Sequence, residues 1–157
     1  MKPSSLITLF LMFIVPAVSF AGNSSFIKGK GFRGYIFDKN YDYWGSSDRY
    51  TPTASEIMQA ESLLKKKIHE INQPRVNQGN GCPEIDKKLN RYVRQYFGYL
   101  NQKGERIISI NCIWDKEVDS RISTDIIGVK DGCSYYWRIE INLSTNEIYD
   151  LHVNGLG

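Results

Sequence analysis

The clearest hydrophobic pattern in the chain predicts one amphipathic helix over residues 54–72. Apolar residues recur there at intervals of three and four, which places them on one helical stripe. These residues are Ile57, Ala60, Leu64, Ile68 and Ile71. Glu61 and the run of lysines at 65–67 lie largely on the other side. Thr53 and Glu56 have the spacing of a capping box, so we expect the helix to begin at Ala54 and to pack through one face only.

Alternating patterns after the helix predict antiparallel strands. Pro and Gly residues first break the helical pattern over residues 74–83, in a loop that contains Cys82. Residues 90–100 and 106–114 are rich in aromatic and β-branched side chains, and the turn at 101–104 joins them into a hairpin. Residues 133–143 alternate between apolar and polar positions, which predicts a strand with one buried and one wet face. The apolar positions are Cys133, Tyr135, Trp137, Ile139, Ile141 and Leu143. A turn at 144–146 leads to a last strand over 147–154, with Tyr149, Leu151 and Val153 in phase.

The segment before the helix has no such pattern. Residues 24–50 mix glycines with aromatic residues, which predicts a loose arm with one short strand at 34–38. The predicted fold is therefore α+β, with one amphipathic helix packed on an antiparallel sheet of four to five strands. We expect an arm at 22–50 and a folded domain at 51–157.

The first 21 residues have the pattern of a secretory signal peptide. Lys2 supplies the positive charge, residues 6–18 are mostly apolar, and Ser19 and Ala21 place small residues where a signal peptidase reads. The apolar run is shorter than the roughly 20 residues of a transmembrane helix, and no second run follows. We expect cleavage after Ala21 and a secreted or periplasmic protein without a transmembrane segment.

Composition narrows the function classes only slightly. Removal of Lys2 leaves 19 basic residues (20 − 1) against 17 acidic ones, a net charge of about +2. The charges are interspersed, whereas nucleic-acid binding requires a clustered basic stripe, so we expect no nucleic-acid partner. The three cysteines allow three pairings, of which Cys112 with Cys133 is our first choice and Cys82 with Cys112 the second. The alternative is that all three thiols are simply packed in the core.

Candidate chemistry is sparse. The two histidines, His69 and His152, fall on solvated faces, and no Cys or His spacing matches a metal site. No serine lies in a GxSxG motif, and no nucleophile is paired with a base at a known spacing. We therefore expect no metal, no cofactor and no catalytic residue, and an enzyme is disfavoured.

Polar and aromatic residues on the strands suggest a binding surface. Arg91 and Arg94 alternate with tyrosines in the first hairpin, and we place them on the outer face of the sheet with a continuation from the later strand. The candidate binding residues are Arg91, Tyr92, Arg94, Tyr96, Tyr136 and Arg138. Cross-strand aromatic and charge pairs of this kind also stabilise a solvated sheet without a ligand.

Several local strings and the element order together resemble known proteins. The strings are Tyr50-Thr51-Pro52-Thr53, Tyr92-Val93-Arg94-Gln95-Tyr96-Phe97-Gly98, Ile110-Asn111-Cys112, Lys130-Asp131-Gly132-Cys133 and Val153-Asn154-Gly155. A helix followed by two hairpins behind an export signal resembles the cystatin-like and NTF2-like architecture of small exported bacterial proteins. The resemblance implies the fold and brings no activity with it. Cystatins hold proteases with an N-terminal glycine, a QxVxG motif in the first hairpin and a Pro-Trp motif in the second. The hairpin tips at 101–104 and 144–146 lack the last two motifs, and only the N-terminal glycine has a counterpart here, Gly29 or Gly31.

Two function classes follow. The first is an exported, non-enzymatic binding protein whose partner is an unidentified protein or glycan, in one version a protease inhibitor with a wedge unlike that of cystatins. The second is a small NTF2-like pocket enzyme or small-ligand binder. A pocket protein encloses a cavity with a buried ionisable group, whereas a protein that binds through its surface fills its core with apolar side chains. The predicted inward positions are nearly all apolar, which favours the first class.

Overall fold

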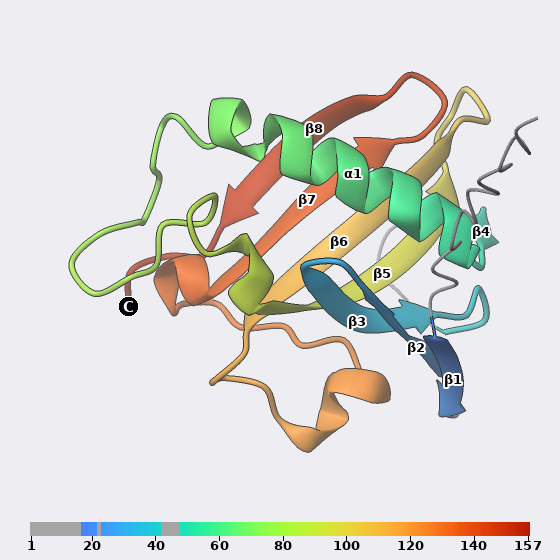
Figure 1. Cartoon of the computed structure of the whole chain (residues 1–157), viewed down its shortest axis with the longest axis horizontal. Helices are drawn as coiled ribbons and strands as arrows, with labels where there is room; N and C mark the ends of the chain where they lie inside the picture. The colour runs from blue at the N-terminus through green and yellow to red at the C-terminus, as the bar shows by residue number, and fades with distance from the viewer. Residues whose placement is uncertain (1–16, 22, 42–47) are drawn as a thin grey trace, which may run out of the picture.

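One helix packs across one face of a mixed β-sheet (Figure 1). The computed structural model describes residues 17–21, 23–41 and 48–157. The helix is α1 (Ala54–Ile71). The strands are β1 (Ala17–Ala21), β2 (Ser24–Gly29), β3 (Phe32–Phe37), β4 (Arg49–Tyr50), β5 (Tyr92–Leu100), β6 (Arg106–Trp114), β7 (Tyr136–Asn142) and β8 (Glu147–Val153). Their order in the sheet is β1-β2-β3-β5-β6-β7-β8, and β4 pairs with β5. The α+β class is confirmed, but the sheet is larger than the predicted four to five strands.

Local signals place α1 as predicted. The Thr53 side chain accepts a hydrogen bond from the Glu56 amide, and the Glu56 carboxylate accepts one from the Thr53 amide. Both bonds satisfy amides that the first helical turn leaves without a partner. The apolar stripe is buried against the sheet at Ile57, Ala60, Leu64 and Ile68. Glu61 is also buried, with 6% of its surface exposed, so the expectation that it lies on the side away from the apolar stripe is wrong.

The two predicted hairpins form the centre of the sheet. Strand β5 pairs with β6 and β7 with β8, both antiparallel, and β6 pairs with β7 between them. Ile110 lies opposite Tyr96 on one side and Ile139 on the other, and all three face α1 in the main core. The core under the helix therefore combines one alternate set of residues from each strand.

The last strand departs from its predicted phase. The pairing between β7 and β8 shifts between Arg138 and Glu140, and Asp150 has a φ of 53°. An extra residue at such a bulge moves the following side chains to the opposite face. As a result Ile148 packs against the core together with Leu151, whereas Tyr149 is 41% exposed.

Two paired strands replace the loose arm expected before the helix. Strands β2 and β3 form a hairpin, and β3 runs parallel to β5. Ile27, Phe32 and Ile36 from this hairpin are buried in the main core. Gly34 allows β3 to approach β5 closely, since a Cβ atom there would lie 2.2 Å from the Arg94 carbonyl oxygen. The short strand expected at 34–38 overlaps β3, but its pairing with β5 was not predicted, because strand propensity does not indicate a partner so far along the chain.

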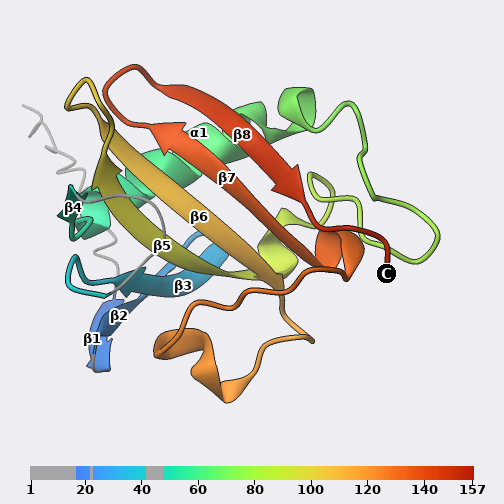
Figure 2. The ribbon, with the colours of Figure 1, turned by 180° about the vertical axis from the view of Figure 1, so that it is seen from behind.

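The second face of the sheet is partly covered by residues 115–132, which include the 3₁₀ turn η2 (Ser120–Ser123) (Figure 2). Ile122 and Ile127 from this segment pack on Val93 and Ile113 of the sheet. Gln95 of β5 is fully buried between these layers. This face is therefore less solvated than the alternating pattern predicts.

The disulfide joins Cys82 to Cys133, and Cys112 is a buried free thiol. Both pairings that we weighed for Cys112 are therefore wrong. Cys133 lies in the 3₁₀ turn η3 (Cys133–Tyr135), before β7 begins, and has a φ of 48°. Its side chain thus leaves the alternation of the strand and meets the loop that follows α1. Cys112 instead lies opposite Arg94 and Trp137 under the helix.

The disulfide indicates a non-reducing compartment. Within the part of the chain that the structure describes, no helix combines the length and apolarity needed to cross a membrane. Most of the predicted signal peptide, residues 1–16, lies outside the described residues. Its last five residues form β1 at the edge of the sheet.

Candidate functional site

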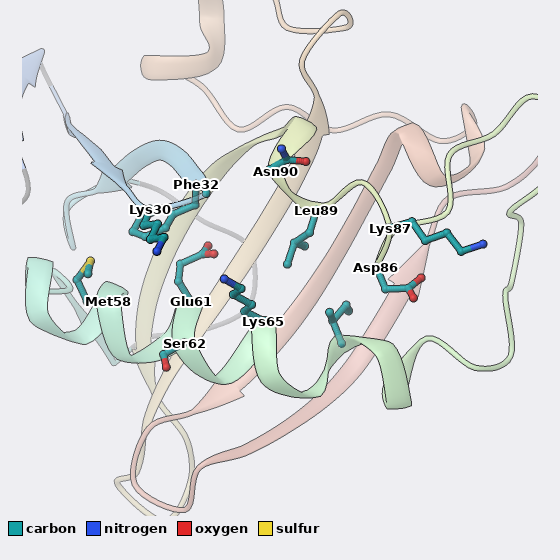
Figure 3. Close-up of a pocket in the computed structure, with 12 residues that line it drawn as sticks. Lys30, Phe32, Met58, Glu61, Ser62, Lys65, Asp86, Lys87, Leu89 and Asn90 are labelled. Atoms are coloured by element: carbon teal, nitrogen blue, oxygen red, sulfur yellow. The ribbon is translucent and has the colours of Figure 1, made fainter.

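A cleft of about 520 Å³ lies between α1, the turn that joins β2 to β3, and the segment at 86–90 (Figure 3). This volume is in the range of small-molecule binding sites. Four apolar side chains line it, together with charged and polar groups. The lining residues are Lys30, Gly31, Phe32, Met58, Glu61, Ser62, Lys65, Ile68, Asp86, Lys87, Leu89 and Asn90. The cleft thus draws on three segments that are far apart in the sequence.

A buried ion pair borders this cleft. The Nε atom of Arg94 lies 2.7 Å from Oε1 of Glu61, and the Arg94 side chain is 0% exposed. The Tyr96 hydroxyl donates a hydrogen bond of 2.8 Å to the same oxygen. The contact between Nε and Oε1 is therefore an ion pair within a buried environment. Glu61 therefore holds two partners through one oxygen, and its Oε2 has no hydrogen-bond partner among the described residues.

The backbone around β5 holds Arg94 in place. Its Nη1 donates to the Tyr92 carbonyl at 2.8 Å and its Nη2 to the Leu89 carbonyl at 3.0 Å. Burial raises the pKa of Glu61, although the Arg94 charge and the Tyr96 hydroxyl act in the opposite direction. A charge removed from water in this way is costly unless it is paired. The ion pair therefore supplies a rigid, polar element to the floor of a partly apolar cleft.

Two lysines at the cleft carry charge that no carboxylate neutralises. Lys30 reaches in from the β2–β3 turn, and Lys65 rises from α1 beside Glu61 (Figure 3). Neither amine has a carboxylate partner within ion-pair distance among the described residues. Lys87, by contrast, pairs with Glu84 at 2.8 Å. The unpaired charge on the lining is therefore positive.

The remaining acid in the lining, Asp86, is neutralised by its own partners. It forms an ion pair with Arg75 and a hydrogen bond of 2.8 Å with Nδ1 of His69, and Asn72 donates a hydrogen bond of 2.9 Å to it. Burial would raise the pKa of Asp86, but these three hydrogen bonds outweigh that effect and hold the pKa well below its usual range. Asp86 thus anchors the segment at 86–90 to the end of α1 and shapes one wall of the cleft.

The predicted binding surface does not form. Tyr92, Arg94 and Tyr96 are 0% exposed and face α1, not solvent as expected. Arg91 is exposed and pairs with Asp115 at 2.8 Å. Tyr136, by contrast, lies on the opposite face of the sheet. It packs there against the smaller apolar cluster of Val93, Ile113, Ile122 and Ile127.

A small hollow of about 120 Å³ contains Tyr136 and Arg138 together with His152. The structure therefore divides the five predicted residues that lie in strands between the two faces of the sheet, and Arg91 lies in the 3₁₀ turn before β5. Only the position of Arg94 brings one of them to the cleft, through its contact with Glu61.

The sequence contained a signal for the correct face. The turn at 101–104 closes a hairpin in which Tyr96 pairs with Ile110 and Arg94 with Cys112. Residues directly opposite each other in an antiparallel pair share a face. Ile108, Ile110 and Cys112 alternate along residues 106–114 and form an apolar face, so Tyr96 and Arg94 belong on that face too. No comparable signal marked Lys30, whose role depends on where the β2–β3 hairpin docks.

No protein-family model, curated protein or solved structure matches the chain. The described residues also contain no group of three or more His, Cys, Asp or Glu side chains placed to hold a metal ion.

Proposed function

We propose that this is an exported, non-enzymatic binding protein that holds a small amphipathic anion in the cleft beside α1. The observation that carries the proposal is the pair of unneutralised lysines, Lys30 and Lys65, over a cleft of about 520 Å³ with apolar walls. The apolar body of the ligand packs on Phe32, Ile68 and Leu89, and its acidic group binds the lysines.

Binding without catalysis agrees with the lining. Among the described side chains of the cleft there is no histidine or cysteine, and Ser62 is exposed with no base bonded to it. Nucleophilic catalysis by a serine needs a general base within hydrogen-bond reach of its hydroxyl. The pocket-enzyme alternative rests on Glu61 alone, one of whose oxygens is already engaged by Arg94 and Tyr96.

The protease-inhibitor version has less support. The Asn101 side chain bonds the amides of Lys103 and Glu105, and the Asn142 side chain bonds those of Ser144 and Thr145. Both hairpin tips are thus closed upon themselves and offer no extended edge to a protease.

Export and fold family belong to the same proposal. The Cys82–Cys133 disulfide supports secretion, and with it the cleavage that we expect after Ala21. The β5–β6 and β7–β8 hairpins that follow α1 support a cystatin-like plan. Strands β2 and β3, with the parallel β3–β5 pair, add to that plan.

Titration calorimetry with decanoate tests the function. We expect saturable binding to the intact protein, weakened about fivefold or more by Lys65→Gln, because a charge-assisted hydrogen bond is lost. Lys66→Gln is the matched control, since Lys66 is exposed on the same helix and does not line the cleft. Absence of binding, or equal affinity in both variants, would contradict the proposal.

A further inference from the structure

A second hollow, of about 390 Å³, lies on the other side of the β2–β3 turn. It shares Gly31, Phe32 and Asn90 with the cleft beside α1, so the two spaces adjoin at these residues. Its remaining lining residues are Lys28, Gly29, Arg33, Arg91 and Asp115. Figure 3 shows Phe32 and Asn90, which line both hollows, on the side of the cleft away from α1.

Two like charges face each other on the hairpin that forms this second hollow. Lys28 and Arg33 are direct partners in the β2–β3 register, and both are exposed. Like charges directly opposite each other destabilise an antiparallel pair. Among the described residues neither cation has an ion-pair partner that would offset this repulsion. An anion bound between them would do so.

The acid in this hollow does not cancel that charge. Asp115 is held by Arg91, whose Nε and Nη2 lie 2.8 Å from Oδ2. These two residues form a neutral pair, and Arg91 also stacks over the Trp114 ring. The charge that remains at the second hollow therefore comes from Lys28 and Arg33.

The hairpin that carries these cations is firmly placed. Gly31 has a φ of +88°, the positive value that a type II turn requires at its second central residue. Phe32 is buried in the main core directly after the turn. The positions of Lys28, Lys30 and Arg33 relative to α1 therefore follow from backbone pairing and not from a free loop.

We propose that the two hollows form one elongated site with an anion subsite at each end. This inference rests on the proposed function, because it extends the same cleft. One acidic group of the ligand binds Lys30 and Lys65, the apolar body passes Phe32, and a second acidic group binds Lys28 and Arg33. The ligand class is therefore a linear amphipathic molecule with two separated acidic groups.

Calorimetry with matched acids tests the second subsite. Sebacate is decanoate with an additional terminal carboxylate, so the ratio of the two dissociation constants isolates that group. We expect the intact protein to bind sebacate about fivefold more tightly than decanoate, through a second charge-assisted contact. Lys28→Gln and Arg33→Gln should each remove this preference and leave decanoate affinity unchanged. Lys103→Gln, in the distant β5–β6 turn, is the control and should change neither value.

The outcomes separate the two proposals. Decanoate binding without any sebacate preference, or a preference that survives both hairpin variants, would overturn the second subsite and leave the cleft proposal intact. Failure of both acids to bind would overturn both. A further measurement uses the free protein: Lys28→Gln should raise the melting temperature because it removes the repulsion with Arg33, and a lower melting temperature would contradict that repulsion.

Discussion

Arg94 and Gln95 are neighbours in β5, both fully buried, yet they lie on opposite faces of the sheet in different chemical settings. The amide of Gln95 donates to the Ile122 and Asp125 carbonyls at 2.9 and 2.7 Å, and its oxygen accepts from the Ile127 amide at 2.9 Å. Arg94 instead places a full charge beside Glu61, at the floor of an open cleft.

The difference separates two uses of a buried polar group. Gln95 satisfies its hydrogen bonds within the fold and holds residues 115–132 against the sheet. Arg94 and Glu61 keep a costly ion pair next to a cavity, where Oε2 of Glu61 has no partner among the described residues. The first arrangement serves the stability of the fold, whereas the second places a buried ion pair beside the cleft in which we propose that a ligand binds.

The largest effect is expected from Arg94→Met, which leaves Glu61 buried without its counter-charge. We expect the free energy of unfolding to fall by about 3 to 5 kcal/mol, as is typical when one partner of a buried pair is removed. Urea denaturation measures this loss. Adding Glu61→Gln should restore part of it, since Gln can still accept from the Tyr96 hydroxyl. A loss below about 1 kcal/mol would show that the pair is not a buried charge in solution.

A smaller and more local effect is expected from Gln95→Ala. The variant loses three bonds to residues 122–127, which should cost about 2 kcal/mol and speed amide hydrogen exchange over that segment. Decanoate affinity should stay unchanged, because the cleft lies on the opposite face. Gln102→Ala, in the exposed β5–β6 turn, provides the control. Weakened binding in Gln95→Ala would break the functional separation of the two faces.

The smallest effect concerns the wall of the cleft and depends on pH. The pKa of Asp86 is lowered in the folded protein, so its contribution to stability is present above the unfolded value of about 4 and is lost as pH falls toward the folded value. The free energy of unfolding should therefore decrease below about pH 4, and Asp86→Asn should flatten this decrease. Denaturation at a series of pH values checks it. An equal slope in both proteins would show that other carboxylates dominate the acid response.

Local interactions explain what the sequence predicted well. The capping box at Thr53 and Glu56 and the apolar spacing of α1 involve residues within one or two helical turns. The turn at 101–104 likewise fixes the β5–β6 hairpin, and β6 begins and ends at the predicted residues. Each of these features depends on residues that are close in the chain, so it can be predicted from the sequence without knowledge of the fold.

Non-local pairing explains the rest. The β2–β3 hairpin is stabilised because β3 pairs with β5, where Arg33 lies opposite Val93, some 60 residues further along the chain. No local sequence pattern indicates that contact. The pairing of Cys82 with Cys133 depends on a 3₁₀ turn that directs Cys133 away from its strand.

The sequence by itself determined the α+β class, the helix and the two hairpins, because helix caps, turns and hydrophobic periodicity act over a few residues. Only the tertiary structure decided the cleft, because its lysines and its buried Glu61 come from a hairpin, a helix and a loop that meet through packing. The physical reason is that a cleft of this kind depends on which faces are turned toward each other, and that is set by contacts between distant segments.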